Sequence, residues 1–183
     1  LDILKQENVK ATFFILGSNV DSRKDVVKRM YEEGHYLANH GYSHTYSKIY
    51  SSPQSVLDEY NECNDKVKNA IEVPDYNSHL FRFPGGLAGG KYAEIKKEAK
   101  ELLLQNNIVN VDWNALTGDA ETNNLSVEFE MTRLTETMES KNSLVILMHD
   151  AAAKSVTADA LPQIIAKLKE EGYEFKNFYD IIK

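Results

Sequence analysis

Two histidines four positions apart, His40 and His44, have the spacing in this chain that most directly suggests chemistry. Positions i and i+4 share one face of a helical turn, or of a loop with that shape, so both imidazoles can reach one ion at about 2.0–2.1 Å. Two surface or capping histidines would have the same spacing by chance. Both, however, closely follow the apolar run 35–38, which reads as a strand, and this position favours a metal site.

Three more ionisable residues stand where predicted strands end, namely Arg82, Asp112 and His149. His149 closes the apolar run 143–148, and an imidazole that titrates near neutrality suits general acid or base catalysis, although a histidine can also simply terminate a strand. Arg82 begins the glycine-rich segment 83–86, whose backbone N–H groups can stabilise a developing oxyanion. A surface turn with a solvated arginine is the competing interpretation.

Tryptophan and cysteine each occur only once in the chain, and the two residues suggest different roles. Trp113, the single tryptophan, follows Asp112, and its ring can stack on a sugar, although packing in the core is the commoner use of such a residue. Cys63, the single cysteine, lies on an apolar helical stripe, which predicts a buried hydrophobic residue and not a nucleophile. With one cysteine no internal disulfide can form, which fits both a cytosolic and an exported protein.

Apolar periodicity predicts the elements that position these residues. Short apolar runs predict strands at 11–16, 35–38, 79–81, 108–111 and 143–148. Amphipathic spacing predicts helices at 1–8, 21–33, 53–71, 91–105, 125–141 and 158–171, with a last helical turn that ends at Lys183. Strands that alternate with helices indicate an α/β fold of parallel βα units, which we expect to form one domain over residues 1–183. The carboxyl ends of such strands open onto one face.

The composition narrows the class of partner. The 183 residues carry a formal net charge of -7, which argues against nucleic acid or an anionic membrane surface as the main partner, because both select basic faces. No apolar run approaches the roughly 18 residues that a membrane-spanning helix needs. We also see no signal peptide in the sequence.

Taken in order, four motifs resemble those of the polysaccharide deacetylases, the NodB-homology domain or carbohydrate esterase family 4. They are Asn39-His-Gly-Tyr-Ser-His44, Phe81-Arg-Phe-Pro-Gly-Gly86, Asp112-Trp113 and Leu147-Met-His149. The segment 10–17 is also similar to the second strand of that family, and the resemblance covers essentially the whole chain. It implies a distorted (β/α) barrel and a metal-dependent hydrolase, most often with zinc, that removes acetyl groups from polymers such as peptidoglycan or chitin. It also implies an extracellular or cell-wall location.

The resemblance also implies a role for each matching residue. His40 and His44 would be two metal ligands, and His149 would be the general acid that protonates the leaving group. Arg82 would orient the catalytic base, and the backbone N–H of Gly85 would donate to the oxyanion. Asp112 would tune His149. Trp113 and Leu147 would shape the pocket for the acetyl group.

Three departures from the family pattern stand out. Gly41 occupies a position where Ser or Thr is usual, and Gly85 one where Tyr is common. The family's first motif, Thr-Phe-Asp-Asp-Gly-Pro, supplies the base and the third metal ligand, and the sequence contains no Asp-Asp pair. We therefore expect an aspartate on a strand ahead of Leu1, and weak metal binding without it. Asp119 and Asp150 are less favoured substitutes.

Two other functions compete with the deacetylase interpretation. One is a non-catalytic carbohydrate-binding relative that keeps the sugar groove without the hydrolytic centre, and the other is a different metal hydrolase on a similar barrel. Because a pure binding module needs neither an acid nor an arginine clamp, His149, Arg82 and Asp112 favour the enzyme.

Overall fold

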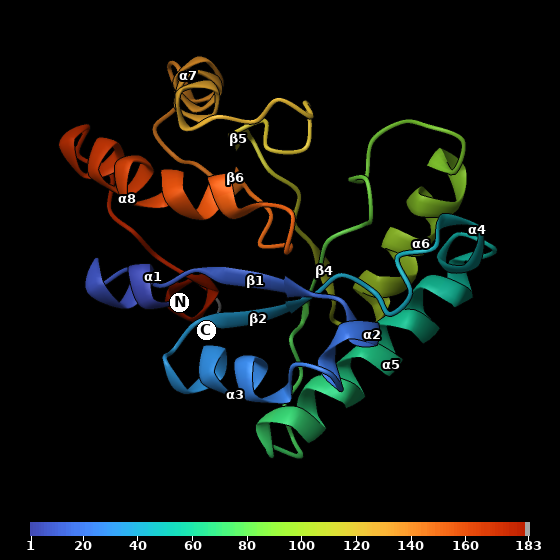
Figure 1. Ribbon diagram of the computed structural model, residues 1–183. Coiled ribbons are helices and arrows are strands. Elements are labelled where there is room, and N and C mark those ends of the chain that lie inside the picture. The colour runs from blue at the N-terminus through green and yellow to red at the C-terminus, as the bar shows by residue number, and fades with distance from the viewer. Residues whose placement is uncertain (182–183) are drawn as a thin grey trace. The chain divides into compact units, whose positions relative to one another are not determined.

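The structure, a computed structural model, describes residues 1–181 of the chain. Its contacts divide these residues into two units (Figure 1). The four-stranded unit contains Lys10–Asp112 and the segment that begins at Lys176, and the two-stranded unit contains Leu1–Val9 and Trp113–Phe175. The expectation of one domain over residues 1–183 stays a prediction.

The four-stranded unit is built on a parallel sheet in which the spatial order of the strands follows the order of the chain. Its first two strands lie side by side over their whole length, with Phe13 opposite Leu37 (Figure 1). The later strands pair only briefly, with Phe81 opposite Asn110. The strands are β1 (Thr12–Ile15), β2 (Tyr36–Asn39), β3 (Leu80–Phe81) and β4 (Val109–Asn110). Because all of them are parallel, their carboxyl ends share one edge.

The longest helix of this unit, α5 (Pro53–Ile71), has the bounds that the sequence predicts. Ser52 caps its start by accepting the Ser55 N–H, and Pro53 stands in its first turn. Cys63 is completely buried on its inner face, as predicted. The other helices of the unit are α2 (Gly17–Val20), α3 (Lys24–Glu32), α4 (Tyr46–Ile49) and α6 (Ala93–Gln105).

An aromatic core lies beneath α4, α5 and α6. It contains Tyr50, Tyr60, Phe81 and Phe83, each at most 2% exposed. Ring contacts connect each of these residues to another member of the core, for example the edge-on contact of Phe81 with Phe83, whose centroids are 5.0 Å apart. This core therefore supports the residues that directly follow β3.

The two-stranded unit pairs β5 (Ala115–Leu116) with β6 (Ile146–Leu147) in parallel. Its helices are α1 (Asp2–Gln6), α7 (Val127–Met138) and α8 (Ser155–Glu170), and α7 packs on α8 around Leu134, Ala160 and Ile164. The expected strand 143–148 is shortened to two paired residues, and the sequence pattern did not predict β5. In the four-stranded unit, a 3₁₀ turn, Phe178–Asp180, stands where a last helical turn was predicted, and the end of that prediction, residues 182–183, lies outside the described residues.

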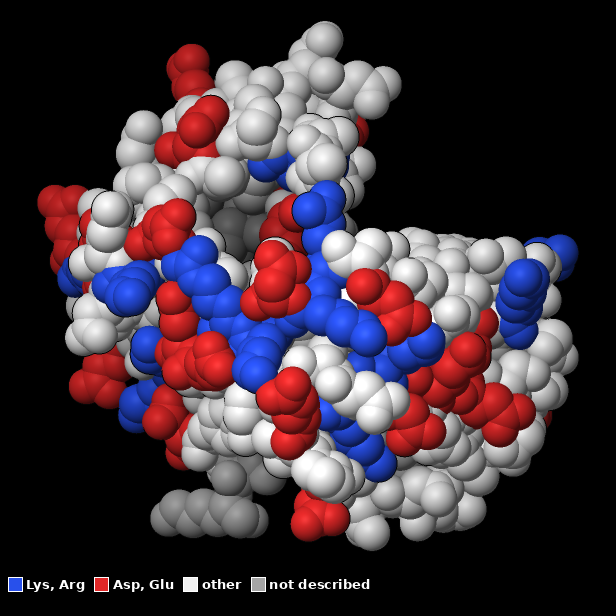
Figure 2. All heavy atoms as spheres, turned by 60° about the horizontal axis from the view of Figure 1, so that its bottom comes forward, with Lys and Arg blue, Asp and Glu red and all other residues white. Residues whose placement is uncertain are grey.

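Acidic and basic side chains are interspersed on the face shown in Figure 2, where the α3 and α5 side of the four-stranded unit comes forward. Ion pairs account for part of this mixture, including Lys66 with Asp21 and Arg29 with Glu33. On this face basic groups therefore lie next to acidic ones. Within the described residues, none of the helices combines the length and the apolar character needed to cross a bilayer.

Candidate active site

His40 directly follows β2, and its ring is held by the backbone of the next strand's end. Its Nδ1 lies 2.7 Å from the Arg82 carbonyl oxygen. Because a carbonyl oxygen only accepts hydrogen bonds, Nδ1 carries the proton and Nε2 keeps the lone pair that a metal requires. The ring of His44 lies nearby, with its centroid 5.2 Å from that of His40. The structure thus brings the two predicted ligands together in one unit.

The loop that carries both histidines is anchored by Glu59 of α5. The Glu59 carboxylate accepts the backbone N–H groups of Tyr42 and Ser43, each at 3.0 Å, and the Ser43 hydroxyl at 2.5 Å. A Cβ at Gly41, whose φ is +80°, would lie 2.8 Å from Ile49 Cδ1 and 3.1 Å from Glu59 Oε2. The space that a side chain at position 41 would need is therefore filled, and Glu59 holds the loop in place of a hydroxyl at that position.

Arg82 is 7% exposed and connects the end of β3 to the end of β4. Its Nε donates to the Val111 carbonyl at 2.9 Å and its Nη2 to the Asp112 carbonyl at 3.1 Å, while the guanidinium lies 3.8 Å from the centroid of the Phe14 ring. Burial lowers the pKa of Arg82 to about 10, and the neighbouring Asp112 charge opposes that shift. The arginine remains a cation at neutral pH.

Gly85 is exposed in a turn whose neighbouring residues Pro84 and Gly86 are buried. Its φ of +76° favours glycine, and a Cβ there would lie 2.5 Å from the Tyr46 hydroxyl oxygen. Tyr46 comes from α4, and its ring also contacts His44, with centroids 5.8 Å apart. The Tyr46 hydroxyl therefore lies beside position 85, where the family that the motifs resemble often has a tyrosine.

In the two-stranded unit, His149 is paired with Asp119. His149 Nδ1 lies 2.9 Å from Asp119 Oδ1, and the His149 backbone N–H donates to Oδ2 at 2.6 Å. The hydrogen bond that His149 donates to Asp119 and the charge of Asp119 raise the pKa of His149, whereas partial burial and Lys154 act in the opposite direction. The pair favours a protonated imidazolium, the form in which a histidine is a general acid.

The carboxylate that contacts His149 differs from the one to which the sequence assigned the tuning role. Asp112 was the expected partner, but its Oδ2 accepts the Leu87 N–H at 2.9 Å. Asp119 instead accepts the backbone N–H and the ring Nδ1–H of His149, whereas the sequence suggested Asp119 only as a substitute metal ligand. The two predicted pocket residues, Trp113 and Leu147, are half-buried in the two-stranded unit.

The donor set fits a metal in part. His40 and His44 supply two imidazoles, which are suitable zinc ligands, and the carbonyl contact of His40 is typical of metal-binding histidines. A catalytic zinc site ordinarily has three protein ligands, and the described residues contain no group of three His, Cys, Asp or Glu side chains placed to hold an ion.

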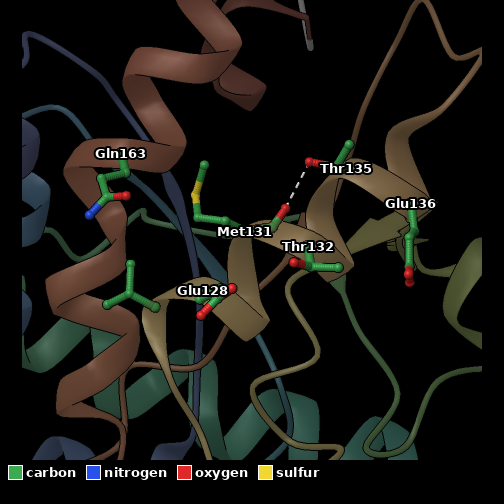
Figure 3. Close-up of a pocket in the computed structure, with 7 residues that line it drawn as sticks. Glu128, Met131, Thr132, Thr135, Glu136 and Gln163 are labelled. Atoms are coloured by element: carbon green, nitrogen blue, oxygen red, sulfur yellow. Dashed lines mark hydrogen bonds between the residues drawn. The ribbon is translucent and has the colours of Figure 1, made fainter.

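A groove of about 670 Å³ lies between α7 and α8 of the two-stranded unit (Figure 3). Met131 and Thr135 of α7 both line it, and the Thr135 hydroxyl donates to the Met131 carbonyl at 2.8 Å. None of the predicted site residues lines it. The complete lining is Val127, Glu128, Met131, Thr132, Thr135, Glu136 and Gln163.

The sequence model of the family described as polysaccharide deacetylase matches residues 1–105, more than half of the chain. The chain belongs to the polysaccharide deacetylase family. A peptidoglycan-N-acetylglucosamine deacetylase of Bacillus cereus is 32% identical over 183 residues, which is 98% of this chain and 63% of the relative. The chain spans about three fifths of the length of the curated relatives that it matches first, between 59% and 63%.

Solved structures confirm the predicted fold class. The catalytic domain of a peptidoglycan N-acetylglucosamine deacetylase from Eubacterium rectale superposes with a TM-score of 0.87 at 29% identity, covering 96% of this chain and 79% of that one. A pseudoenzyme of carbohydrate esterase family 4 from Bacillus anthracis gives a TM-score of 0.77 at 25% identity, covering 100% of this chain and 58% of that one. The α/β fold with parallel strands is thus the deacetylase fold, a distorted barrel.

Proposed function

We propose that this chain is the larger part of a metal-dependent hydrolase that removes acetyl groups from an N-acetylglucosamine-type polysaccharide, with peptidoglycan as the first candidate and chitin as the second. The observation that carries the proposal is the Asp119–His149 pair, because a histidine fixed through Nδ1 and biased toward its protonated form is suited to deliver a proton. The names of the relatives support the substrate class. We further propose that the protein works outside the cell, at the wall.

The proposed reaction assigns one task to each group. A divalent ion, zinc in the first instance, would polarise the acetyl carbonyl and lower the pKa of a water molecule when it is bound by His40 and His44. The Gly85 N–H donates to the oxygen of the acetyl carbonyl as negative charge develops on it. Water adds to the acetyl carbon while the catalytic base takes a proton from it. His149 then gives the proton on Nε2 to the departing nitrogen as the C–N bond breaks, so that the amine leaves in its neutral form and acetate remains.

The remaining predicted residues have supporting tasks in this proposal. Arg82 keeps the ends of β3 and β4 together through two carbonyl hydrogen bonds and would orient the catalytic base. Trp113 and Leu147 would form the walls of the acetyl pocket. Asp112 anchors the turn through the Leu87 N–H, and Asp119 takes over the tuning of His149.

We further propose that an aspartate pair ahead of Leu1 supplies the third metal ligand and the catalytic base. The test uses the chain preceded by about thirty further residues, enough for one strand, one loop and the start of a helix. Bound zinc is measured together with acetate release from N-acetylated chitooligosaccharide and from peptidoglycan. We expect one metal ion per chain and acetate release, and His44→Ala should lose the metal while its circular dichroism spectrum stays unchanged.

A non-catalytic carbohydrate-binding protein is the second candidate. It is favoured by the pseudoenzyme among the solved relatives and by the two, not three, ligands found in the described residues. The same experiment separates the candidates, because a protein that binds zinc and oligosaccharide without releasing acetate would be a binding protein. In a deacetylase, His149→Gln should keep the metal and lose acetate release.

A further inference from the structure

The turn that follows Arg82 has a defined geometry. The Gly86 N–H donates to the Phe83 carbonyl at 2.8 Å, which closes a four-residue turn with Pro84 and Gly85 in its centre. With proline first and a glycine of φ +76° second, this is a type II turn. The central Pro84–Gly85 peptide is trans, so its carbonyl and its N–H point in opposite directions. Whatever holds the carbonyl therefore sets the direction of the N–H.

A buried tyrosine holds that carbonyl. The Tyr50 hydroxyl donates to the Pro84 carbonyl oxygen at 2.6 Å, and Tyr50 is only 1% exposed. Its ring is itself fixed by Phe83 and Tyr92, whose centroids lie 6.4 and 5.3 Å away. Burial raises the pKa of the Tyr50 hydroxyl, so this group remains a donor throughout the neutral range.

The peptide that follows the turn, Gly86–Leu87, is also held on both sides. Lys96, 4% exposed, donates to the Gly86 carbonyl at 2.7 Å, and the Leu87 N–H donates to Asp112 at 2.9 Å. The Gly85 N–H differs from these groups, because within the described residues it has no hydrogen-bond partner. Since Gly85 is also exposed, its N–H is the donor that the turn presents outward.

We propose that Tyr50 is a positioning residue of this site: by holding the Pro84 carbonyl inward, its hydroxyl makes the Gly85 N–H point outward, where a developing oxyanion can accept it. The inference rests on the proposed deacetylase function for its catalytic consequence. Its structural half, the direction of one peptide plane, can be tested without activity. Tyr50 itself does not touch the substrate.

The test compares kcat and KM of Tyr50→Phe and Tyr36→Phe in the upstream-extended chain used to measure acetate release. Tyr36 is a fitting control, because it is 5% exposed in the same unit and its hydroxyl donates to another buried carbonyl, that of Ser78. Loss of a whole oxyanion donor costs about 10²–10³-fold in kcat, and a misdirected donor should cost less, so we expect about a tenfold lower kcat for Tyr50→Phe with little change in KM. Tyr36→Phe should leave both constants near those of the natural enzyme.

A second measurement reads the turn directly. In a type II turn the Pro84 Hα lies close to the Gly85 amide proton and gives a strong nuclear Overhauser effect, which weakens when the central peptide turns over. We expect this effect to weaken in the 1–183 chain carrying Tyr50→Phe and to persist in Tyr36→Phe. An unchanged effect in Tyr50→Phe, or equal kcat values for the two variants, would overturn the inference. Absence of acetate release from the natural enzyme would instead refute the proposed function, while the spectrum would still decide the role of Tyr50.

Discussion

Both carboxylate oxygens of Asp119 contact His149, and Oδ2 also lies 3.5 Å from the Thr157 hydroxyl oxygen. Oδ1 lies 2.9 Å from His149 Nδ1, and Oδ2 accepts the His149 backbone N–H at 2.6 Å. Asp119 is 1% exposed, whereas the side chain of His149 is 43% exposed. The buried partner therefore fixes the ring of an accessible one, which leaves Nε2 as the nitrogen that can exchange protons with a substrate.

This pairing gives the first prediction. Asp119→Asn should reduce kcat by about 10²-fold, in the range that general acid catalysis contributes, because a neutral amide neither fixes the Nδ1–H tautomer nor stabilises the imidazolium. Acetate release measured against pH provides the test, and zinc content should not change. Asp159→Asn is the matched control, an exposed aspartate on α8 in the same unit. Equal rates for the two variants would remove Asp119 from the proposed mechanism.

The second prediction concerns stability and pH. The pKa of His149 is raised in the folded state above its ordinary value near 6.5, so the charged pair stabilises the fold fully below about pH 6.5. This stabilisation disappears as the pH rises through the raised pKa. The free energy of unfolding of the natural chain minus that of His149→Gln should therefore fall as the pH rises above about 6.5. Urea unfolding at several pH values measures it, and a flat or rising difference would contradict the pairing.

Local sequence patterns predicted those parts of the fold whose signals are local. Helix α5 has its cap residue, its first-turn proline and its apolar stripe within one segment, and its predicted bounds match the structure. The spacing of His40 and His44 is likewise a local signal, and the two rings do lie together. The order of the motifs was enough to predict the family and the fold class.

Contacts between distant segments were not predictable in this way. Glu59 anchors the histidine loop from 16 and 17 positions along the chain, and no periodicity marks that contact. Asp119 follows β5, whose two residues are too short to give a strand pattern, so Asp112 beside the tryptophan was the more visible carboxylate. The short acidic segment after β5 would have pointed to Asp119 only if that strand had been recognised.

The third prediction tests the role of Glu59. Glu59→Ala removes the acceptor of two backbone N–H groups and one hydroxyl in the loop that carries His40 and His44. Loss of such a supporting contact typically lowers metal affinity by about 10–100-fold, and we expect a loss in that range for zinc, measured by calorimetry. Glu62→Ala, an exposed glutamate on the same helix, should bind zinc like the natural chain. Equal affinities for both variants would mean that the loop holds its shape without Glu59.

The fourth prediction separates backbone strain from a steric contact at the turn. Gly85 and Gly89 have similar positive φ angles, +76° and +70°, so alanine at either should cost about 1–2 kcal/mol in backbone strain. A Cβ at Gly85 would also lie 2.5 Å from the Tyr46 hydroxyl oxygen, whereas one at Gly89 would meet nothing within 4 Å. We therefore expect Gly85→Ala to be the more destabilising by about 1 kcal/mol in urea unfolding. Because the crowding atom is the hydroxyl, Tyr46→Phe should reduce this excess when combined with Gly85→Ala and should leave the cost of Gly89→Ala unchanged. An equal cost at the two glycines would show that Tyr46 moves away freely and does not restrict position 85.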